Sequence, residues 1–291
     1  MSSQISFASS KRLERCLKVS VLTLGLGISA AQASAPDSYH VALDGTFAPH
    51  AMPTMSGDVQ GFNVDLANAL GEQLGAEMQI TSTQFSGLIP GLQAGTYDFL
   101  MAPTTVTEER AANLLFSEGY LDTDFQFVVK KGAPDITDLH QLDGQVVAVN
   151  KGSAYDSWAR EHAEEYGWRV EAYGTNSDAI QAVMSGRAAA NVAGNTVSAY
   201  AVSKNPAIEL SYLVETGLVW AIPFRKDDSE DRDRVERALE CLKMNGVMAE
   251  LSEKWFGVEP AEDATAVTPI HGFGQPGFSG YVEDEHAFSC D

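Results

Sequence analysis

Arg110 is the residue whose type and setting most directly suggest chemistry. It follows an expected strand end and a threonine-rich turn. A guanidinium presents a planar fork of N–H donors that matches a carboxylate in a bidentate pair. The same side chain could instead form a surface ion pair with Glu108 or Glu109. These residues therefore predict either an anchor for a carboxylate or a solvated surface arginine.

Residues 150–155 and Asp44 could likewise either bind a ligand or have a local structural role. Residues 150–155 open an expected helix after a strand, and the backbone N–H groups of Ser153 and Ala154 point out of its N-terminus. They could hold an anion, or Ser153 could simply cap the helix. Asp44 ends the first expected strand. It could accept an ammonium or guanidinium from a ligand, or cap the turn that follows.

These residues must be positioned by an alternation of strands and helices. The expected strands span 39–44, 78–83, 97–102, 125–129, 146–149, 170–173, 188–193 and 218–223. The expected helices span 59–74, 86–93, 152–166, 177–184, 197–203 and 232–256, the last with a turn at Gly246. This order is typical of parallel sheets with helices on their faces.

The alternation occurs twice, with the second unit inserted in the first and two apolar strands as crossings. Two crossings favour a hinge over a flexible linker. We expect an α/β fold with lobe 1 from 39–128 and 218–257 and lobe 2 from 129–217, each with its own sheet. A cleft between such lobes, lined by strand ends and helix N-termini, suits a small anion.

The N-terminus reads as an export signal. Basic residues precede the apolar run 19–28, and Ala31-Gln32-Ala33 follows, so we expect residues 1–33 to be a cleaved signal peptide. The run is too short for a stable membrane span. The 291-residue chain has a net charge of −21, and 15 basic and 39 acidic residues remain after residue 33. That balance argues against binding nucleic acid or an anionic membrane.

Motifs for catalysis or for a cofactor are weak. The six histidines lack metal-ligand spacing, and no serine or cysteine lies in a nucleophile motif. Only His50 and Glu118 lie near pocket segments as candidate acid or base groups. The run 272–277 matches the glycine pattern of dinucleotide sites, but no strand precedes it and Pro276 interrupts it. We expect no metal, no cofactor and no enzyme activity.

An ordered set of short motifs resembles the polar amino-acid family of periplasmic solute-binding proteins of ABC importers. The resemblance covers about 39–257. It rests on DGTFAP at 44–49, GFNVDLA at 61–67, LIPGL at 88–92, GTYD at 95–98, TVTEER at 105–110, FSEGY at 116–120 and KWFG at 254–257. The resemblance implies the two-lobe (type II) periplasmic-binding fold with the ligand cleft between the lobes.

The resemblance also implies a ligand site. Arg110 would hold the ligand carboxylate, Thr105 would add a donor, and Phe47 and Phe85 would place rings against the ligand side chain, although both rings could be ordinary core residues. The full set of expected ligand-binding residues is Asp44, Phe47, Phe85, Pro103, Thr104, Thr105, Arg110, Ser153, Ala154, Tyr155, Gly194 and Asn195.

The chain departs from the family at Gly194. Family members commonly place an aspartate there to bind the α-ammonium of the ligand, and here Gly194 is followed by Asn195. A buried ammonium without a carboxylate partner is costly. Either Asp44 or another acid compensates, or the ligand is an imino-type zwitterion such as ectoine or a plain organic acid.

We therefore expect a monomeric periplasmic protein that captures a carboxylate-bearing zwitterion, an amino acid first of all, and passes it to the membrane permease of an ABC importer. The alternative activity is an enzyme of the same fold, similar to cyclohexadienyl dehydratases. A sensing module of a receptor would need a separate partner chain.

Two cysteines remain after residue 33. In an oxidising compartment Cys241 and Cys290 could form a disulfide that ties the C-terminal segment to a helix, or they could be unrelated thiols. Residues 258–291 are acidic and rich in proline. We expect them to form a surface extension of the fold.

Overall fold

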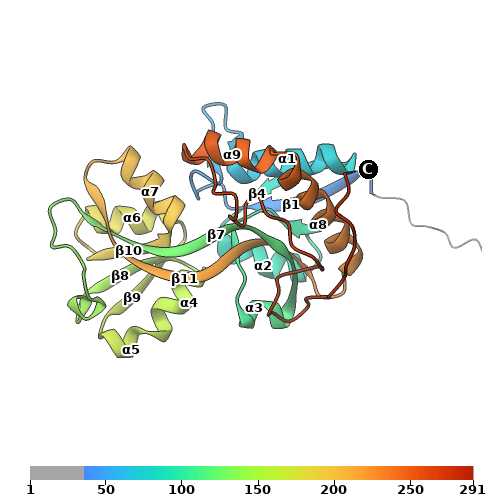
Figure 1. The fold of residues 1–291 in the computed structure, drawn as a ribbon. Coiled ribbons are helices and arrows are strands. Elements are labelled where there is room, and N and C mark those ends of the chain that lie inside the picture. The colour runs from blue at the N-terminus through green and yellow to red at the C-terminus, as the bar shows by residue number, and fades with distance from the viewer. Residues whose placement is uncertain (1–35, 291) are drawn as a thin grey trace, which may run out of the picture. The chain divides into compact units, whose positions relative to one another are not determined.

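The computed structural model describes residues 36–290 (Figure 1). The expected signal peptide, residues 1–33, lies outside the described residues. Within 36–290, no helix combines the length and the apolar character that a membrane span needs.

The first α/β unit follows the expected order. Strand β1 (Ser38–Leu43) pairs in parallel with β4 (Glu77–Ser82) on one side and β5 (Phe99–Leu100) on the other. Helices α1 (Phe62–Leu74) and α2 (Phe85–Gln93) connect them. Helix α1 ends at Gly75, whose φ of 66° gives the left-handed cap that glycine allows most easily. The smaller elements are β2 (Met52–Pro53), β3 (Val59–Gln60), β6 (Thr104–Thr105) and α3 (Glu108–Asn113).

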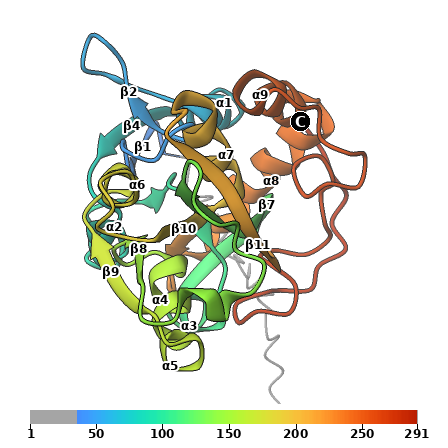
Figure 2. The ribbon, with the colours of Figure 1, turned by 90° about the vertical axis from the view of Figure 1, so that its left-hand side faces the viewer.

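The second α/β unit also has the expected alternation. Its elements are η1 (Leu139–Leu142), β8 (Val146–Asn150), α4 (Ala154–Glu161), α5 (Ala163–Tyr166), β9 (Arg169–Tyr173), α6 (Asn176–Met184), β10 (Ala190–Gly194) and α7 (Asn195–Lys204). Figures 1 and 2 show α4 and α5 on one face of strands β8, β9 and β10, and α6 and α7 on the other. The helix expected over 152–166 is divided at His162, whose Nδ1 lies 2.9 Å from the carbonyl of Trp158.

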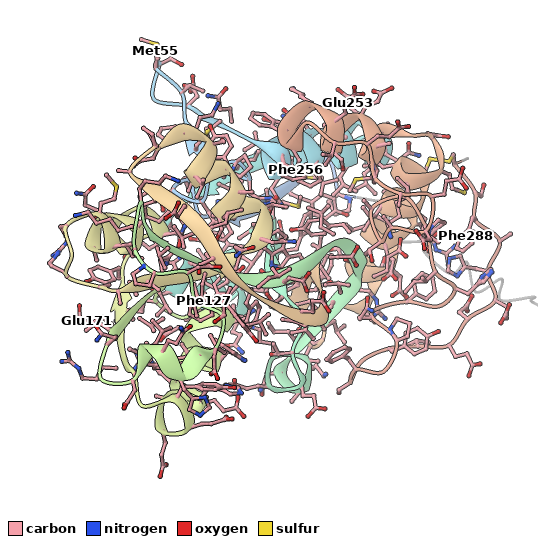
Figure 3. All side chains as sticks on the ribbon, turned by 60° about the vertical axis from the view of Figure 1, so that its left-hand side comes forward. Met55, Phe127, Glu171, Glu253, Phe256 and Phe288 are labelled. Atoms are coloured by element: carbon pink, nitrogen blue, oxygen red, sulfur yellow. A yellow bond between two sulfur atoms is a disulfide. The ribbon has the colours of Figure 1, made fainter. Side chains whose placement is uncertain are left out.

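Two long antiparallel strands connect the units. Strands β7 (Leu114–Lys130) and β11 (Ile208–Arg225) pair along most of their length. Because of this pairing, the strands form one hydrogen-bonded path, in the order β4-β1-β5-β11-β7-β10-β8-β9. The expectation of a separate sheet in each lobe is therefore wrong: β7 and β11 belong to both units. Phe127 of β7, labelled in Figure 3, packs against Trp158 and Trp168.

The pairing of β7 and β11 with neighbouring strands indicates where the chain crosses from one lobe to the other. Residues Phe125 to Val129 of β7 pair with β10 of the second unit. Further along, Trp220 and Ala221 of β11 pair with β6 of the first. The register of β7 against β11 shifts between Val214 and Leu218. We propose that the first crossing lies near Asp124 rather than after Val128. We propose that the second crossing lies after Gly217.

The chain then returns to the first unit through two helices. Helix α8 (Ser229–Met244) and helix α9 (Val247–Phe256) are separated at Gly246, where the turn was expected. Both helices pack on α1 (Figure 1).

The C-terminal segment is held against α8 and β7 by polar contacts. The backbone N–H of Gly274 donates to both carboxylate oxygens of Glu236 at 2.8 and 2.9 Å, and that of Ile270 donates to Glu118 Oε2 at 2.8 Å. His286 Nε2 lies 2.9 Å from Glu240 Oε1. The structure also contains a disulfide between Cys241, which is buried in α8, and Cys290. The segment is thus fastened to the fold at several points along its length.

We expect the disulfide to stabilise the fold. Cys290→Ser is expected to lower the free energy of unfolding by about 2–4 kcal/mol, because the bridge closes a long loop and restricts the unfolded chain. The melting temperature should fall by about 4–15 °C. Thermal unfolding with and without a reductant measures this. Reductant should lower the melting temperature of the parent and leave that of the variant unchanged. Free thiols at both cysteines in peptide mapping of the oxidised protein would refute the bridge.

Candidate functional site

A small cavity collects most of the expected ligand-binding residues. Its lining is Phe47, Phe85, Pro103, Thr105, Arg110, Asn150, Ser153, Ala154 and Tyr155. Eight of these nine were expected from the sequence, and Asn150 was not. They come from both α/β units: the loop after β1, α2, the turn at β6 and α3 on one side, and β8 and α4 on the other.

Arg110 lies where the two units meet. It stands in the first turn of α3, and its backbone N–H donates to the capping hydroxyl of Thr107. Its Nη1 donates to the carbonyl of Thr105 at 2.9 Å, and its Nη2 donates across to the carbonyl of Gly152 at 3.2 Å. The guanidinium carbon lies 5.6 Å from the centre of the Phe85 ring. Burial lowers the pKa of Arg110 to about 10, so the side chain stays cationic at neutral pH.

The surface ion pair that the sequence left open for Arg110 is not formed: within 36–290, no salt bridge joins it to Glu108 or Glu109.

The N-terminus of α4 faces the same cavity. Ser153 caps the helix by accepting a hydrogen bond from Asp156 N at 3.1 Å. Its own backbone N–H donates to the carbonyl of Asn150 at 3.2 Å. Ser153 therefore acts as a cap, and its N–H already has an acceptor. Ala154 begins the helix next to it, where the positive end of the helix dipole favours an anion.

Asp44 does not line the cavity. Its Oδ1 accepts hydrogen bonds from the backbone N–H and the hydroxyl of Thr46 at 2.9 and 2.7 Å, and its Oδ2 accepts one from the N–H of Phe85 at 3.2 Å. The carboxylate is buried. Asp44 thus caps the turn after β1 and accepts from the start of α2, while its role in ligand binding stays a prediction.

Gly194 stands where large side chains leave no room for another. A Cβ atom added there would lie 2.6 Å from Trp220 Cζ2 and 2.8 Å from the hydroxyl of Tyr155. The indole N–H of Trp220 donates to the Thr105 hydroxyl at 3.2 Å. The indole of Trp220 and the phenol of Tyr155 thus occupy the space that an aspartate side chain at position 194 would need. Burial raises the pKa of Tyr155, so it is a neutral phenol.

Two more expected residues lie outside the cavity. The hydroxyl of Thr104 donates to the carbonyl of Ala102 at 2.8 Å. Asn195 begins α7, where its side-chain oxygen accepts from the N–H of Thr196 at 2.9 Å. It lines a different, wider groove of about 700 Å³ beside α7 and α9. That groove does not include Arg110, so its size alone does not make it the anion site.

The two residues considered for catalysis also lie elsewhere. His50 is fully buried, with its ring nitrogens 2.9 Å from Asn63 Oδ1 and from the hydroxyl of Thr196. Burial lowers the pKa of His50 to about 3, so the ring is neutral at physiological pH. Glu118 pairs with Lys243 beneath the C-terminal segment. Within 36–290, no group of histidine, cysteine or acidic residues has the arrangement of a metal site.

The cavity is closed in this structure. Its free volume is about 10 Å³, close to the space that one water needs. Ligand pockets are usually far larger. The contact from Arg110 to Gly152 joins the two units at the cavity, and the contact from His50 to Thr196 joins them outside its lining. A solute could therefore enter only after the units move apart or the side chains shift.

The chain is similar to proteins that bind amino acids. It matches Bacterial extracellular solute-binding proteins, family 3, over residues 39–258. The L-arginine-binding protein of Pseudomonas aeruginosa is 28% identical over 227 residues, 75% of this chain and 88% of that protein. The lysine/arginine/ornithine-binding periplasmic protein of Escherichia coli is 26% identical over 253 residues, 82% of this chain and 97% of that protein.

A solved structure agrees with these relatives. An ancestral arginine-binding protein bound to arginine has a TM-score of 0.73 and 34% identity, over 76% of this chain and 99% of its own. The mixed α/β architecture is thus that of a periplasmic binding protein, as the motifs implied. The chain belongs to family 3 of the bacterial extracellular solute-binding proteins.

Proposed function

We propose that this protein captures an amino acid outside the cytoplasm and delivers it to an ABC importer. The observation that carries the proposal is the cavity at Arg110, in which a guanidinium from one α/β unit meets the N-terminus of α4 from the other. Both groups favour a carboxylate. The names of the relatives support an amino acid as the carrier of that carboxylate.

Lobe closure follows from this division of donors. When the units are apart, Arg110 and the first turn of α4 each offer hydrogen-bond donors to water. A single carboxylate can satisfy both sets only when the units meet. The ligand thus binds the closed form more tightly than the open form and shifts the population towards it. The register shifts of β7 against β11 between Val214 and Leu218 offer a place for the hinge.

Enzyme activity is not proposed. The named relatives are binding proteins. His50 and Glu118, the acid or base candidates of the sequence, both lie outside the cavity lining.

Export and partners complete the proposal. The relative from Escherichia coli is named periplasmic and one from Bacillus subtilis extracellular. The charge and apolar pattern of residues 1–33 supports export of this chain by a signal peptide. We propose that the exported protein acts as a monomer and docks on the permease of its importer.

A thermal-shift panel of amino acids tests the proposed function. A bound amino acid at about 100 times its Kd should add about 2.7 kcal/mol to the unfolding free energy, which raises the melting temperature by about 5–11 °C. Mass spectrometry of small molecules released from the purified protein should find the same compound.

The control for this panel is the decarboxylated form of each stabilising amino acid, that is, the amine with the same side chain and no carboxylate. Such an amine should give no shift, because Arg110 would have no anion to bind. Equal stabilisation by the amine would contradict the proposed clamp.

A further inference from the structure

Asn150 is a buried polar residue of the cavity whose side-chain oxygen has no hydrogen-bond partner. It ends strand β8, where it pairs with Tyr173 of β9, and it is 1% exposed. Its backbone carbonyl is used, because it accepts from the N–H of Ser153. Its side-chain Oδ1 is fully buried and has no hydrogen bond within residues 36–290. Nearly all buried polar atoms in native proteins have a partner, so an unpaired one requires an explanation.

An unpaired buried oxygen does not mark a site by itself. Asn176 and Asn191 also carry one, but neither lines the cavity. Asn150 combines the unpaired amide with a place in the cavity lining, opposite the unit that carries Arg110. The neighbouring Ser153 hydroxyl caps α4, and the Thr105 hydroxyl accepts from the indole of Trp220. Asn150 is thus the amide of the lining that is left for a ligand.

The charges of the lining limit what this ligand can be. Of the nine lining residues, Arg110 is cationic and none is acidic. Asp44, which lies outside the lining, already accepts three hydrogen bonds from Thr46 and Phe85. A guanidinium or ammonium on the ligand side chain would bury a second positive charge in addition to the α-ammonium, with no acidic residue in the lining to pair with it, which is strongly unfavourable. An amide or hydroxyl would lose less on burial and could pair with the amide of Asn150.

We infer that Asn150 determines ligand specificity: its side-chain amide binds a neutral hydrogen-bonding group on the ligand side chain, so that this protein prefers a polar uncharged amino acid over arginine or lysine. This inference rests on the proposed function, because it takes the carboxylate to be held at Arg110. The inferred ligand thus differs from arginine, the ligand that the names of the two relatives give.

The preference can be measured by calorimetry on the unmodified protein with glutamine, arginine and methionine. Glutamine carries an amide, arginine a cation, and methionine an apolar side chain of similar length to glutamine. Glutamine is expected to bind at least tenfold more tightly than either of the others. Arginine binding as tightly as glutamine, or more tightly, would overturn the inference and would point to Asp44 as the acid for the ligand cation.

Asn150→Leu removes the amide and keeps a similar volume. It should lower the affinity for glutamine about tenfold or more and leave the affinity for methionine equal or higher, since a lost hydrogen bond affects only the ligand that made it. The ratio of the two affinities separates a specificity role from general damage to the fold, which would weaken both ligands together. An unchanged ratio would refute the role of Asn150.

Asn191→Leu is the matched control. Asn191 is equally buried and donates to the carbonyl of Ala148 at 2.9 Å, but it does not line the cavity. Its substitution should lower stability without changing the ratio of affinities. If Asn150→Leu does not fold, the ligand preference of the unmodified protein still decides. Failure of all three ligands to bind would instead count against the proposed function, and with it against this inference.

Discussion

Arg110→Ala is expected to weaken ligand binding by about 2–5 kcal/mol, roughly a thirtyfold to several-thousandfold rise in Kd. The guanidinium lies over the ring of Phe85, donates to the carbonyl of Thr105 in its own unit, and reaches the carbonyl of Gly152 across the closed cavity. A carboxylate bound there would lose its strongest donor pair in a desolvated place. Calorimetry with the ligand found in the thermal-shift panel measures the change.

Two further substitutions test the cause of this loss of affinity. Arg110→Lys should recover only part of the loss, because an ammonium keeps the charge but cannot form the planar fork. Arg169→Ala is the control, since Arg169 is exposed at the start of β9 and lies outside the cavity lining. Its effect on Kd should be negligible. A Kd for Arg110→Ala within about threefold of the parent, a difference of about 0.7 kcal/mol, would refute the carboxylate clamp.

The alternation of strands and helices could be predicted because it depends on local patterns. Apolar residues at helical spacing and glycine stops placed α1, α2 and α6 within a few residues of their observed bounds. The length of β7 could not be found in this way. Its first half carries Ser117, Glu118 and Asp122, which do not look like a strand in sequence. They are accommodated because β11, about a hundred residues away, supplies the hydrogen-bonded partner.

Residues of the cavity were predictable where their role depends on their own chemistry. Arg110 and the start of α4 belong to this group. The role of Asp44 depended on whether Thr46 and Phe85 would turn their N–H groups towards it, which is a matter of backbone geometry. Asn150 could not be predicted as a ligand-binding residue, because polar residues at strand ends are common. Its significance lies in the absence of a partner within the described residues, which only a three-dimensional structure can reveal.

Apart from the disulfide, the contacts of the C-terminal segment could not be predicted from the sequence. Lys243 of α8 is buried against Glu118 of β7, with 2.9 Å between Nζ and Oε1. Its ammonium also donates to the carbonyls of Gly119 and Thr268 at 2.8 and 3.2 Å. One lysine thus joins α8, β7 and the C-terminal segment.

Lys243→Met is expected to lower the free energy of unfolding by about 3–5 kcal/mol, because it leaves the carboxylate of Glu118 buried without its cation. The melting temperature should fall by about 6–20 °C. Lys254→Met is the matched control: Lys254 pairs with Asp65 at 2.7 Å, but its side chain is 60% exposed. Exposed pairs contribute about 0–1 kcal/mol, so that variant should melt close to the parent.

The pH dependence of Lys243→Met tests the cause of this loss. Burial already raises the pKa of Glu118 in the parent, and Lys243 opposes that rise. Without the lysine the folded-state pKa rises further above the unfolded value, so the folded variant binds a proton more readily than the unfolded chain. Its stability should therefore be highest at acid pH and fall as the pH rises through the folded-state pKa of Glu118. Adding Glu118→Gln should restore most of the loss at pH 7, since a neutral amide can still accept the hydrogen bond from Ile270 N. A double variant no more stable than Lys243→Met alone would show that lost packing, and not an unpaired carboxylate, causes the instability.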